Sequence, residues 1–540
     1  MSLQSLHAYC AAAATIAALV LSNQARAQSD PSPAALPVAP SAVDAPAAAT
    51  AEMHPSVETP TAVEPKAAPD EPHSAWHWRH SLDQRFVGER ASVVEGLGPE
   101  ASEAARLGPT SGMQARARAG TQVSYASPDG FFRHAVGELQ VQLRYWDQPW
   151  APLPATHNAL LRGRVELTTT AGQFTLGRSA SVWGLGLLAT DGGYDALQFG
   201  ARQGENAVTR LGWAVLPASL WHKGDPLEAF PLAVAVAYDV QAHDDLARLP
   251  GDAATNQIAA ILYRGKQVQT GAYAVRRAQT DADGLGLAAT VVDGFVRYRR
   301  QTGLGWVEIA AEGLYGWGHT GWLKSPNQPD GLDLAQWGGA ARVEVGRRRG
   351  ALRFEAGGAS ADALPLNGTL RSFRFATDYH VGLVMFGQAQ RQLSAQAAHN
   401  LADPRYSGSA PAGVQRVATW GAVTQALYVH PVVRLQPYKN VAVLLGGVWA
   451  QSPADVADPF RTFLNGGKAT GPRGAQGKRG LGTELDGAVE CTAHLLDGLV
   501  AVARVDAGVW FPGDAYDDAA GGAMAAVGVV QGQVQVRADF

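Results

Sequence analysis

Three features are scarce in this 540-residue chain: cysteine, an excess of basic residues and long apolar runs. Of its 2 cysteines, Cys10 lies in a leading segment that export would remove, so Cys491 alone would remain and no intramolecular disulfide could form. The formal net charge is -4. Because phosphate contacts require a clear basic excess, we expect no nucleic-acid partner.

After the leading segment, no stretch approaches the roughly 20 apolar residues that a transmembrane helix requires. If the chain lies in a membrane, it must therefore cross as a closed sheet, which satisfies every backbone polar group. The sequence also lacks a G-x-S-x-G elbow and a cysteine beside a histidine, the usual signs of a catalytic nucleophile. We expect no enzyme activity, no cofactor and no metal.

The amino-terminal part divides by composition. An apolar run over residues 11–21 is followed by Ala25-Arg26-Ala27, a small-x-small cleavage site, and predicts a signal peptide over residues 1–27. Residues 28–75 are rich in Pro and Ala and predict a disordered tether. Residues 76–136 begin with Trp76-His77-Trp78-Arg79-His80. They are expected to form a periplasmic or plug-like segment that contains a short helix.

From residue 137 to residue 540, segments of about ten residues alternate apolar and polar side chains, as strands with one apolar face do. Short links alternate with long ones rich in Gly, Pro and Asp, a pattern typical of transmembrane barrels. The last segment ends on an aromatic residue, and we interpret Phe540, Val536 and Val534 as an assembly signal. The alternative is a soluble β-sandwich, in which the apolar faces pack against one another.

The predicted fold class is all-β: a transmembrane antiparallel β-barrel of about eighteen strands, with sixteen as the next count. One expected strand covers residues 374–386, and residues 181–205 are expected to form an extracellular loop. The polar faces of the predicted strands would line the lumen. These candidate lumen residues are Arg144, Arg162, Arg164, Arg297, Arg299, Arg342, Arg353, Arg504, Glu308, Glu312, Glu344, Glu355, Glu484, Asp486 and Asp506.

Several short motifs go beyond a generic barrel. Gly482-Thr483-Glu484-Leu485-Asp486-Gly487-Ala488 and the later Trp510-Phe511-Pro512-Gly513-Asp514-Ala515 resemble the closing strands of the alginate-export family of outer-membrane barrels. Leu176-Gly177-Arg178 also resembles a strand of that family. Trp183-Gly184-Leu185-Gly186 and Asp378-Tyr379-His380-Val381-Gly382-Leu383 resemble uncharacterised outer-membrane barrels of predatory and gliding Gram-negative bacteria.

This resemblance implies a monomeric barrel in the outer membrane of a Gram-negative bacterium, in contact with lipid and lipopolysaccharide and inserted by the barrel-assembly machinery. In the export branch it also implies passage of an acidic polysaccharide through an arginine-lined constriction. Here the candidate lumen arginines alternate with carboxylates instead.

Two functions remain open from the sequence. In the first, the lumen is a channel for small hydrophilic solutes or a polysaccharide, used passively or as the exit of an export route. Its mixed charges would then orient solutes across a transverse field. In the second, the barrel is plugged and serves as a structural or adhesion protein of the envelope. The same charges would then only pair with one another across neighbouring strands.

Overall fold

The computed structural model describes residues 76–91, 110–126, 131–147, 155–202, 207–220, 231–241, 251–324, 328–362, 368–408 and 413–540, with a few positions between 244 and 249. The predicted signal peptide and tether lie outside these residues.

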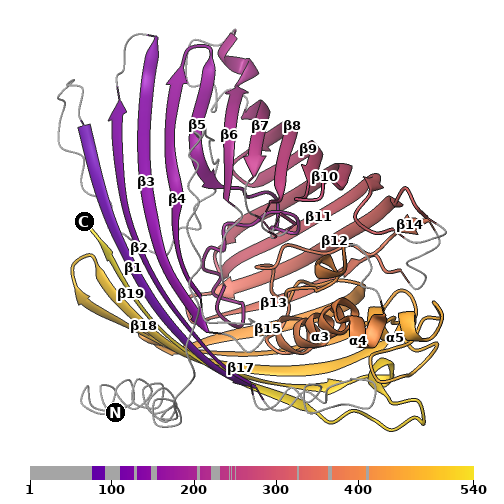
Figure 1. Ribbon diagram of the computed structural model, residues 1–540. Coiled ribbons are helices and arrows are strands. Elements are labelled where there is room, and N and C mark those ends of the chain that lie inside the picture. Colours follow the sequence, from indigo (N-terminus) through magenta and orange to yellow (C-terminus); the bar gives the residue numbers. More distant parts are fainter. Residues whose placement is uncertain are drawn as a thin grey trace, which may run out of the picture.

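The wall of the molecule is a closed antiparallel barrel (Figure 1). Of 19 strands in one sheet, the two-residue β14 pairs in parallel with β12, while β13 pairs directly with β15, so eighteen strands form the wall. These are β1 (Trp76–Ala91), β2 (Thr110–Ala126), β3 (Phe132–Asp147), β4 (Ala155–Thr169), β5 (Gly172–Ala180), β6 (Ala207–Val215), β7 (Leu232–Gln241), β8 (Ala253–Arg264), β9 (Val268–Thr280), β10 (Gly286–Thr302), β11 (Gly305–Thr320), β12 (Leu332–Arg347), β13 (Gly350–Ala359), β15 (Ala426–Tyr438), β16 (Val441–Gln451), β17 (Gly480–Leu496), β18 (Leu499–Pro512) and β19 (Val527–Asp539).

The seam between β1 and β19 closes the barrel. Their register runs from Ser81 opposite Asp539 to Ala91 opposite Val529. Beyond it, the backbone N–H of His80 donates to the carbonyl of Phe540 at 3.0 Å, and the N–H of Phe540 donates back at 2.9 Å. Every wall strand therefore has a partner on both sides, which removes the exposed edges that an open sheet would present.

The predicted count of eighteen is confirmed, but two of its components differ. Within residues 76–136, predicted as a periplasmic or plug-like segment, the described residues belong to the wall and supply β1, β2 and the start of β3. The outward face of β1 carries Trp76, Trp78, Leu82 and Phe86, and the polar residues between them obscure the alternation. Residues 374–386, predicted as a strand, lie inside the barrel instead.

The outward face is apolar around the wall. Large side chains on it remain half exposed, including Phe354 on β13, Leu445 on β16 and Val530 on β19. In water, such a belt would cost about 25 cal/mol per Å² of apolar surface, whereas lipid removes that cost. A closed barrel with this belt is how outer-membrane proteins cross their bilayer, and the chain is an outer-membrane β-barrel of a Gram-negative bacterium. Within the described residues, no helix is both long and apolar enough to cross a membrane.

Links of two or three residues, such as 303–304, 348–349 and 497–498, all lie at one end of the barrel, which we take as periplasmic because outer-membrane barrels have short turns there. Most long links lie at the other, extracellular end. They contain the helices η3 (Met385–Gln390), α3 (Arg391–Ala402), α4 (Pro404–Ser407), η4 (Val414–Arg416), α5 (Pro459–Leu464) and η5 (Asp514–Tyr516), whereas η2 (Pro217–Leu220) follows β6 at the periplasmic end.

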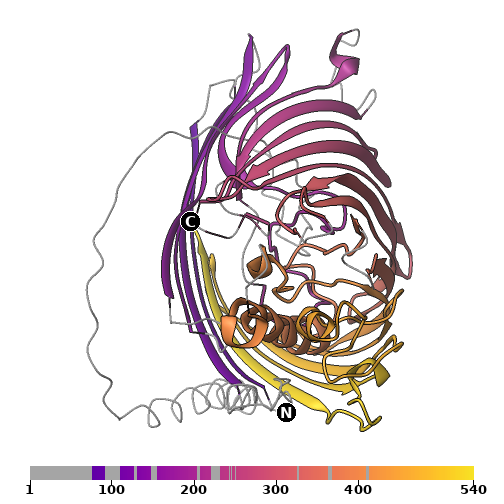
Figure 2. The same ribbon diagram turned by 45° about the vertical axis from the view of Figure 1, so that its right-hand side comes forward.

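Two extracellular links fold back into the barrel instead of lying on its rim. We call residues 181–202 the first inner segment and residues 368–425, which include α3, the second inner segment. Figure 2 shows α3 and its surrounding chain in orange, enclosed by the wall strands. The largest hydrophobic core is therefore inside the barrel, where Phe375, Phe386 and Leu383 of the second inner segment pack with Trp510 and Leu444 of the wall.

We predict that Leu445→Arg, on the outward face of β16, lowers the free energy of unfolding in lipid vesicles by about 2–4 kcal/mol if this position lies near the bilayer midplane. Leu495→Arg, an exposed position beside the periplasmic turn after β17, is the matched control and should cost about 0–1 kcal/mol. Urea titration followed by tryptophan fluorescence measures both. Equal losses for the two variants would contradict the lipid-facing assignment.

Candidate functional site

The inward faces of the wall are of two kinds. Strands β1 to β4, β11 to β13, β15 and β17 to β19 carry charged inward side chains, and every candidate lumen residue of these strands lies on the inward face, opposite exposed apolar neighbours. Arg297 and Arg299 of β10 also point inward. On β6 to β9 and the extracellular half of β10, by contrast, most inward side chains are small or apolar, such as Ala235, Ile258 and Val291.

The first inner segment crosses the lumen and reaches the periplasmic half of the wall. The hydroxyl of Tyr194 donates to Glu490 at 2.9 Å, and Nη2 of Arg353 donates to Oδ1 of Asp195 at 3.0 Å. Glu490 and Arg353 are both close to the periplasmic ends of their strands. Of residues 181–205, predicted as an extracellular loop, the described part, residues 181–202, instead fills part of the pore.

Asp195 is held by a chain of ion pairs that runs along the wall. Nε of Arg353 also contacts Glu344 at 2.7 Å, and Arg342 joins Glu344 at 3.3 Å to Glu308 at 3.4 Å. Burial alone would raise the pKa of Asp195, but the guanidinium groups of Arg353 and Arg202 outweigh it and hold this pKa well below its usual value. The predicted mixed charges thus pair with one another and also anchor the inner segment.

Glu312 of β11 holds the beginning of the first inner segment. Its carboxylate accepts the backbone N–H groups of Leu185 and Gly186, the latter at 3.1 Å. Gly184, just before them, has a φ of +56°, and a Cβ atom there would meet the same carboxylate. A turn with consecutive N–H groups aimed at one anion is a backbone nest, so the glycine is needed for the close approach.

Glu484 of β17 holds the second inner segment in the same way. It is fully buried and accepts the N–H groups of Leu383 at 2.5 Å, Val384 at 2.7 Å and Met385 at 2.6 Å. Gly382 precedes them with a φ of +70°, and a Cβ there would again meet the carboxylate. Two separate inner segments are thus each fixed by a wall carboxylate that binds a glycine-led nest.

Glu355 adds a third contact between the wall and the second inner segment. Its Oε1 accepts the hydroxyl groups of Tyr379 and of Tyr428 on β15, both at 2.8 Å. At the seam, Arg504 donates to the carbonyl of Gln198 at 2.5 Å, and Asp506 accepts the N–H of Gly200 at 3.2 Å. Glu355, Arg504 and Asp506 therefore hold parts of the two inner segments inside the barrel.

Other candidate lumen residues do not belong to these contacts. Arg162 and Arg164 pair with Glu138 of β3 at 3.3 and 2.8 Å, within the wall. Arg299 lies near the periplasmic turn after β10, with its side chain 41% exposed. Arg144 lies on the inward face of β3, opposite Arg116 of β2. Asp486 is buried two residues beyond Glu484.

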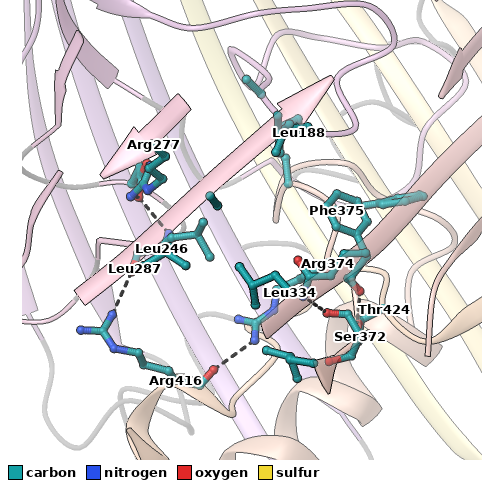
Figure 3. Close-up of a pocket in the computed structure, with 18 of the residues that line it drawn as sticks. Leu188, Leu246, Arg277, Leu287, Leu334, Ser372, Arg374, Phe375, Arg416 and Thr424 are labelled. Carbon is teal, nitrogen blue, oxygen red and sulfur yellow. Dashed lines mark hydrogen bonds and ion pairs between the residues drawn. The ribbon is translucent and has the colours of Figure 1, made fainter. Parts of the chain in front are cut away.

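A cavity of about 1210 Å³ remains between the inner segments and the wall (Figure 3). On the wall side it is lined by β6 to β10, together with Leu334 of β12. On the other side lie Leu188 of the first inner segment and Phe375 of the second. A volume of this size accommodates a small organic molecule, since ligand sites usually occupy about 300–1,000 Å³.

Arg416 connects several chain segments at the extracellular mouth of the cavity. Its Nη1 donates to the carbonyl of Leu246 at 3.1 Å, and its Nη2 pairs with Asp252 at 2.5 Å. The guanidinium also lies 3.9 Å from the ring centroid of Trp322, close enough for a cation–π contact. Arg374 in turn donates to the carbonyl of Arg416 at 3.1 Å. One side chain therefore connects three extracellular links.

The inward-facing arginines of this part of the wall are also paired. Nη2 of Arg210 contacts Asp239 at 2.7 Å, and Nη1 of Arg277 contacts Asp244 at 2.6 Å. None of the candidate lumen residues lines this cavity. The partners of Arg416 come from other links, up to 170 residues away in the sequence. The local signal, inward positions on β7 and β8 that are largely apolar, depends on knowing which face is inward.

We predict that Glu484→Gln loosens the second inner segment, because the amide nitrogen cannot accept the backbone N–H groups that the carboxylate binds. The expected loss is about 1–3 kcal/mol, the cost of leaving buried polar groups unsatisfied. Glu138→Gln, a wall carboxylate that pairs with wall arginines, is the control. Limited proteolysis should cut residues 368–408 faster in the first variant only. Equal cleavage in both would contradict the anchoring role.

No protein-family model matches this chain, and no curated protein does. Among solved structures, Pseudomonas aeruginosa OccK7 (OpdD) is similar at 9% identity and a TM-score of 0.43, over 86% of this chain and 98% of that one. Acinetobacter baumannii OccAB1 is similar at 10% identity and a TM-score of 0.47, over 86% and 96%.

Pseudomonas aeruginosa OccK2 (OpdF), solved in complex with glucuronate, is similar at 9% identity and a TM-score of 0.46, over 86% of this chain and 98% of that one. None of these three structures is described as an alginate exporter, so the resemblance to the alginate-export family stays a sequence-based prediction.

Proposed function

We propose that the protein is an outer-membrane channel through which small hydrophilic solutes pass along the space between the inner segments and strands β6 to β10. The observation that carries this proposal is the cavity of about 1210 Å³ inside a closed barrel. The mechanism is selection by the width and lining of that space. No catalytic step is involved, and no cofactor is needed.

Export of a polysaccharide is a weaker form of the same proposal. A polymer chain needs a continuous wide lumen, whereas the first inner segment spans the lumen and is anchored near the periplasmic end by Asp195 and Arg353. Passage of a polymer would require this ion pair to break. Small solutes make no such demand on the inner segments.

A structural or adhesion barrel is the second candidate, and a specific observation favours it. The candidate lumen carboxylates Glu312, Glu484 and Glu355 all bind inner-segment atoms, so much of the charged lumen is occupied by the protein's own chain. In this case, the cavity would be closed at one end. For both candidates we propose that the barrel-assembly machinery inserts the chain, that the barrel contacts lipopolysaccharide and that it is a monomer.

Single-channel recording of the refolded mature chain in a planar bilayer tests the choice. We predict stable current steps, and larger steps for Asp195→Asn, because that variant releases the deepest anchor of the first inner segment. Glu138→Gln serves again as control and should conduct like the natural chain. Absence of steps from all three, with folding confirmed by heat-modifiable gel migration, would leave the structural barrel.

The same recording has a predicted pH dependence. The pKa of Asp195 is depressed in the folded protein, so its anchoring contribution is present above the ordinary pKa of an aspartate, about 3.9, and is lost only as the pH falls through the lower folded value. The size of the current steps should therefore not change between pH 8 and pH 5 through this anchor, because Asp195 stays ionised over that range. A rise in step size over that range that Asp195→Asn abolishes would contradict the assignment.

A further inference from the structure

The lining of the cavity is the feature that the channel proposal does not explain. A pathway for hydrophilic solutes is expected to be polar, and the inward faces of β1 to β4, β11 to β13, β15 and β17 to β19 carry charges. The cavity lies instead against a sector of the wall whose inward side chains are largely apolar: Ala235 of β7, Ile258 and Leu262 of β8, Val275 of β9, and Ala289 and Val291 of β10.

The inner segments present the same chemistry from the opposite side. Leu188, Phe373 and Phe375 line the cavity there, and Phe375 lies beside Leu188 in Figure 3. Apolar surfaces therefore face each other across the space. Water confined between them gains few hydrogen bonds, whereas a solute with apolar groups removes both surfaces from water.

Three of the arginines at the cavity are paired with groups of opposite charge. Arg210, Arg277 and Arg416 each pair with an aspartate, namely Asp239, Asp244 and Asp252. The pair formed by Arg416 lies at the extracellular mouth, beside Trp322. A polar end of a solute would meet both signs of charge at this mouth, while its remainder would lie against apolar walls.

We propose that the cavity binds water-soluble solutes that have an apolar body and a zwitterionic or otherwise polar end, with the body held against β7 to β10 and the end at the Arg416–Asp252 mouth. This inference rests on the proposed channel function and names its solute class. It separates such solutes from equally small, fully polar ones.

The dipeptides Leu-Leu and Asn-Asn are a matched pair of probes. Both are zwitterionic and close in size, and they differ in whether the side chains are apolar or amide. Equilibrium dialysis against the full mature chain in lipid nanodiscs, with empty nanodiscs as the blank, should give a Kd roughly tenfold or more lower for Leu-Leu, since one methylene in an apolar pocket alone is worth about tenfold or more. Equal Kd values for the two dipeptides would overturn the inference.

Two neighbouring valines of β10 provide the matched variants. Val291 points inward and lines the cavity, whereas Val292 points outward and is 43% exposed to the lipid side. Valine and threonine have the same shape, so Val291→Thr, alone and with Val275→Thr, should reduce the preference for Leu-Leu several-fold without changing the volume. Val292→Thr should leave it unchanged. A preference that survives in the double variant would place the binding site elsewhere and overturn the assignment.

Liposome swelling with the same two dipeptides separates this inference from the proposed function. Faster entry of Leu-Leu together with tighter binding supports both. Preferential binding of Leu-Leu without entry of either dipeptide would remove the channel function and keep the binding site. Entry of both at equal rates with equal Kd values would keep the channel and remove the binding site.

Discussion

The arrangement inside this barrel depends on two carboxylates that bind backbone. Glu312 and Glu484 are wall residues, and each accepts consecutive N–H groups from a turn that follows a glycine with positive φ. A buried carboxylate without partners would be very unfavourable, and an inner segment without an anchor would have no reason to stay in the lumen. The carboxylate therefore gains hydrogen-bond donors, and the inner segment gains an anchor on the wall. The position of the inner segments, and with it the shape of the cavity, depends on these two contacts together with the ion pairs and the core packing inside the barrel.

These contacts also explain why two halves of the molecule differ. Where the inner segments are anchored, the wall presents charges that reach them, through Arg353, Glu355 and Asp506. Where the inner segments stand away from the wall, the inward side chains include Ala235 of β7, Ile258 and Leu262 of β8 and Val291 of β10. The lumen is thus divided into a part filled by protein and a part left open, and the side chains of each part match that difference.

Alternation of apolar and polar residues was sufficient to predict the barrel, its outward face and the number of its strands, because lipid acts on every strand alike. It failed for β1, where His80 and Gln84 interrupt the outward apolar residues, and for residues 374–386, whose apolar content serves the core inside the barrel. The inward position of the charged residues could be predicted from the same parity. Their partners could not, because Glu484 and Val384, or Arg353 and Asp195, are brought together by folding of remote chain and carry no local pattern.

The motifs that resembled other barrels gain a physical meaning from the structure. Glu484 of the G-x-E-x-D strand binds the turn at Gly382, and Gly184 of the Trp183-Gly184-Leu185-Gly186 stretch leads the turn held by Glu312. These short stretches are distant in sequence and meet as carboxylate and nest. A search of related sequences should therefore look for both halves of such a contact together: a glutamate on a wall strand and, in another link, a turn that begins with glycine.

The first inner segment also has a consequence for the closure of the barrel. Oε1 of Gln531 on β19 accepts the N–H of Ala201 at 2.7 Å, while its Nε2 donates to Glu89 of β1 at 2.6 Å. Arg85 of β1 donates to the carbonyl of Arg202. One glutamine thus joins the first strand, the last strand and the inner segment. Because the three parts meet at Gln531, this junction is complete only when β19 has paired with β1 and the inner segment lies in the lumen.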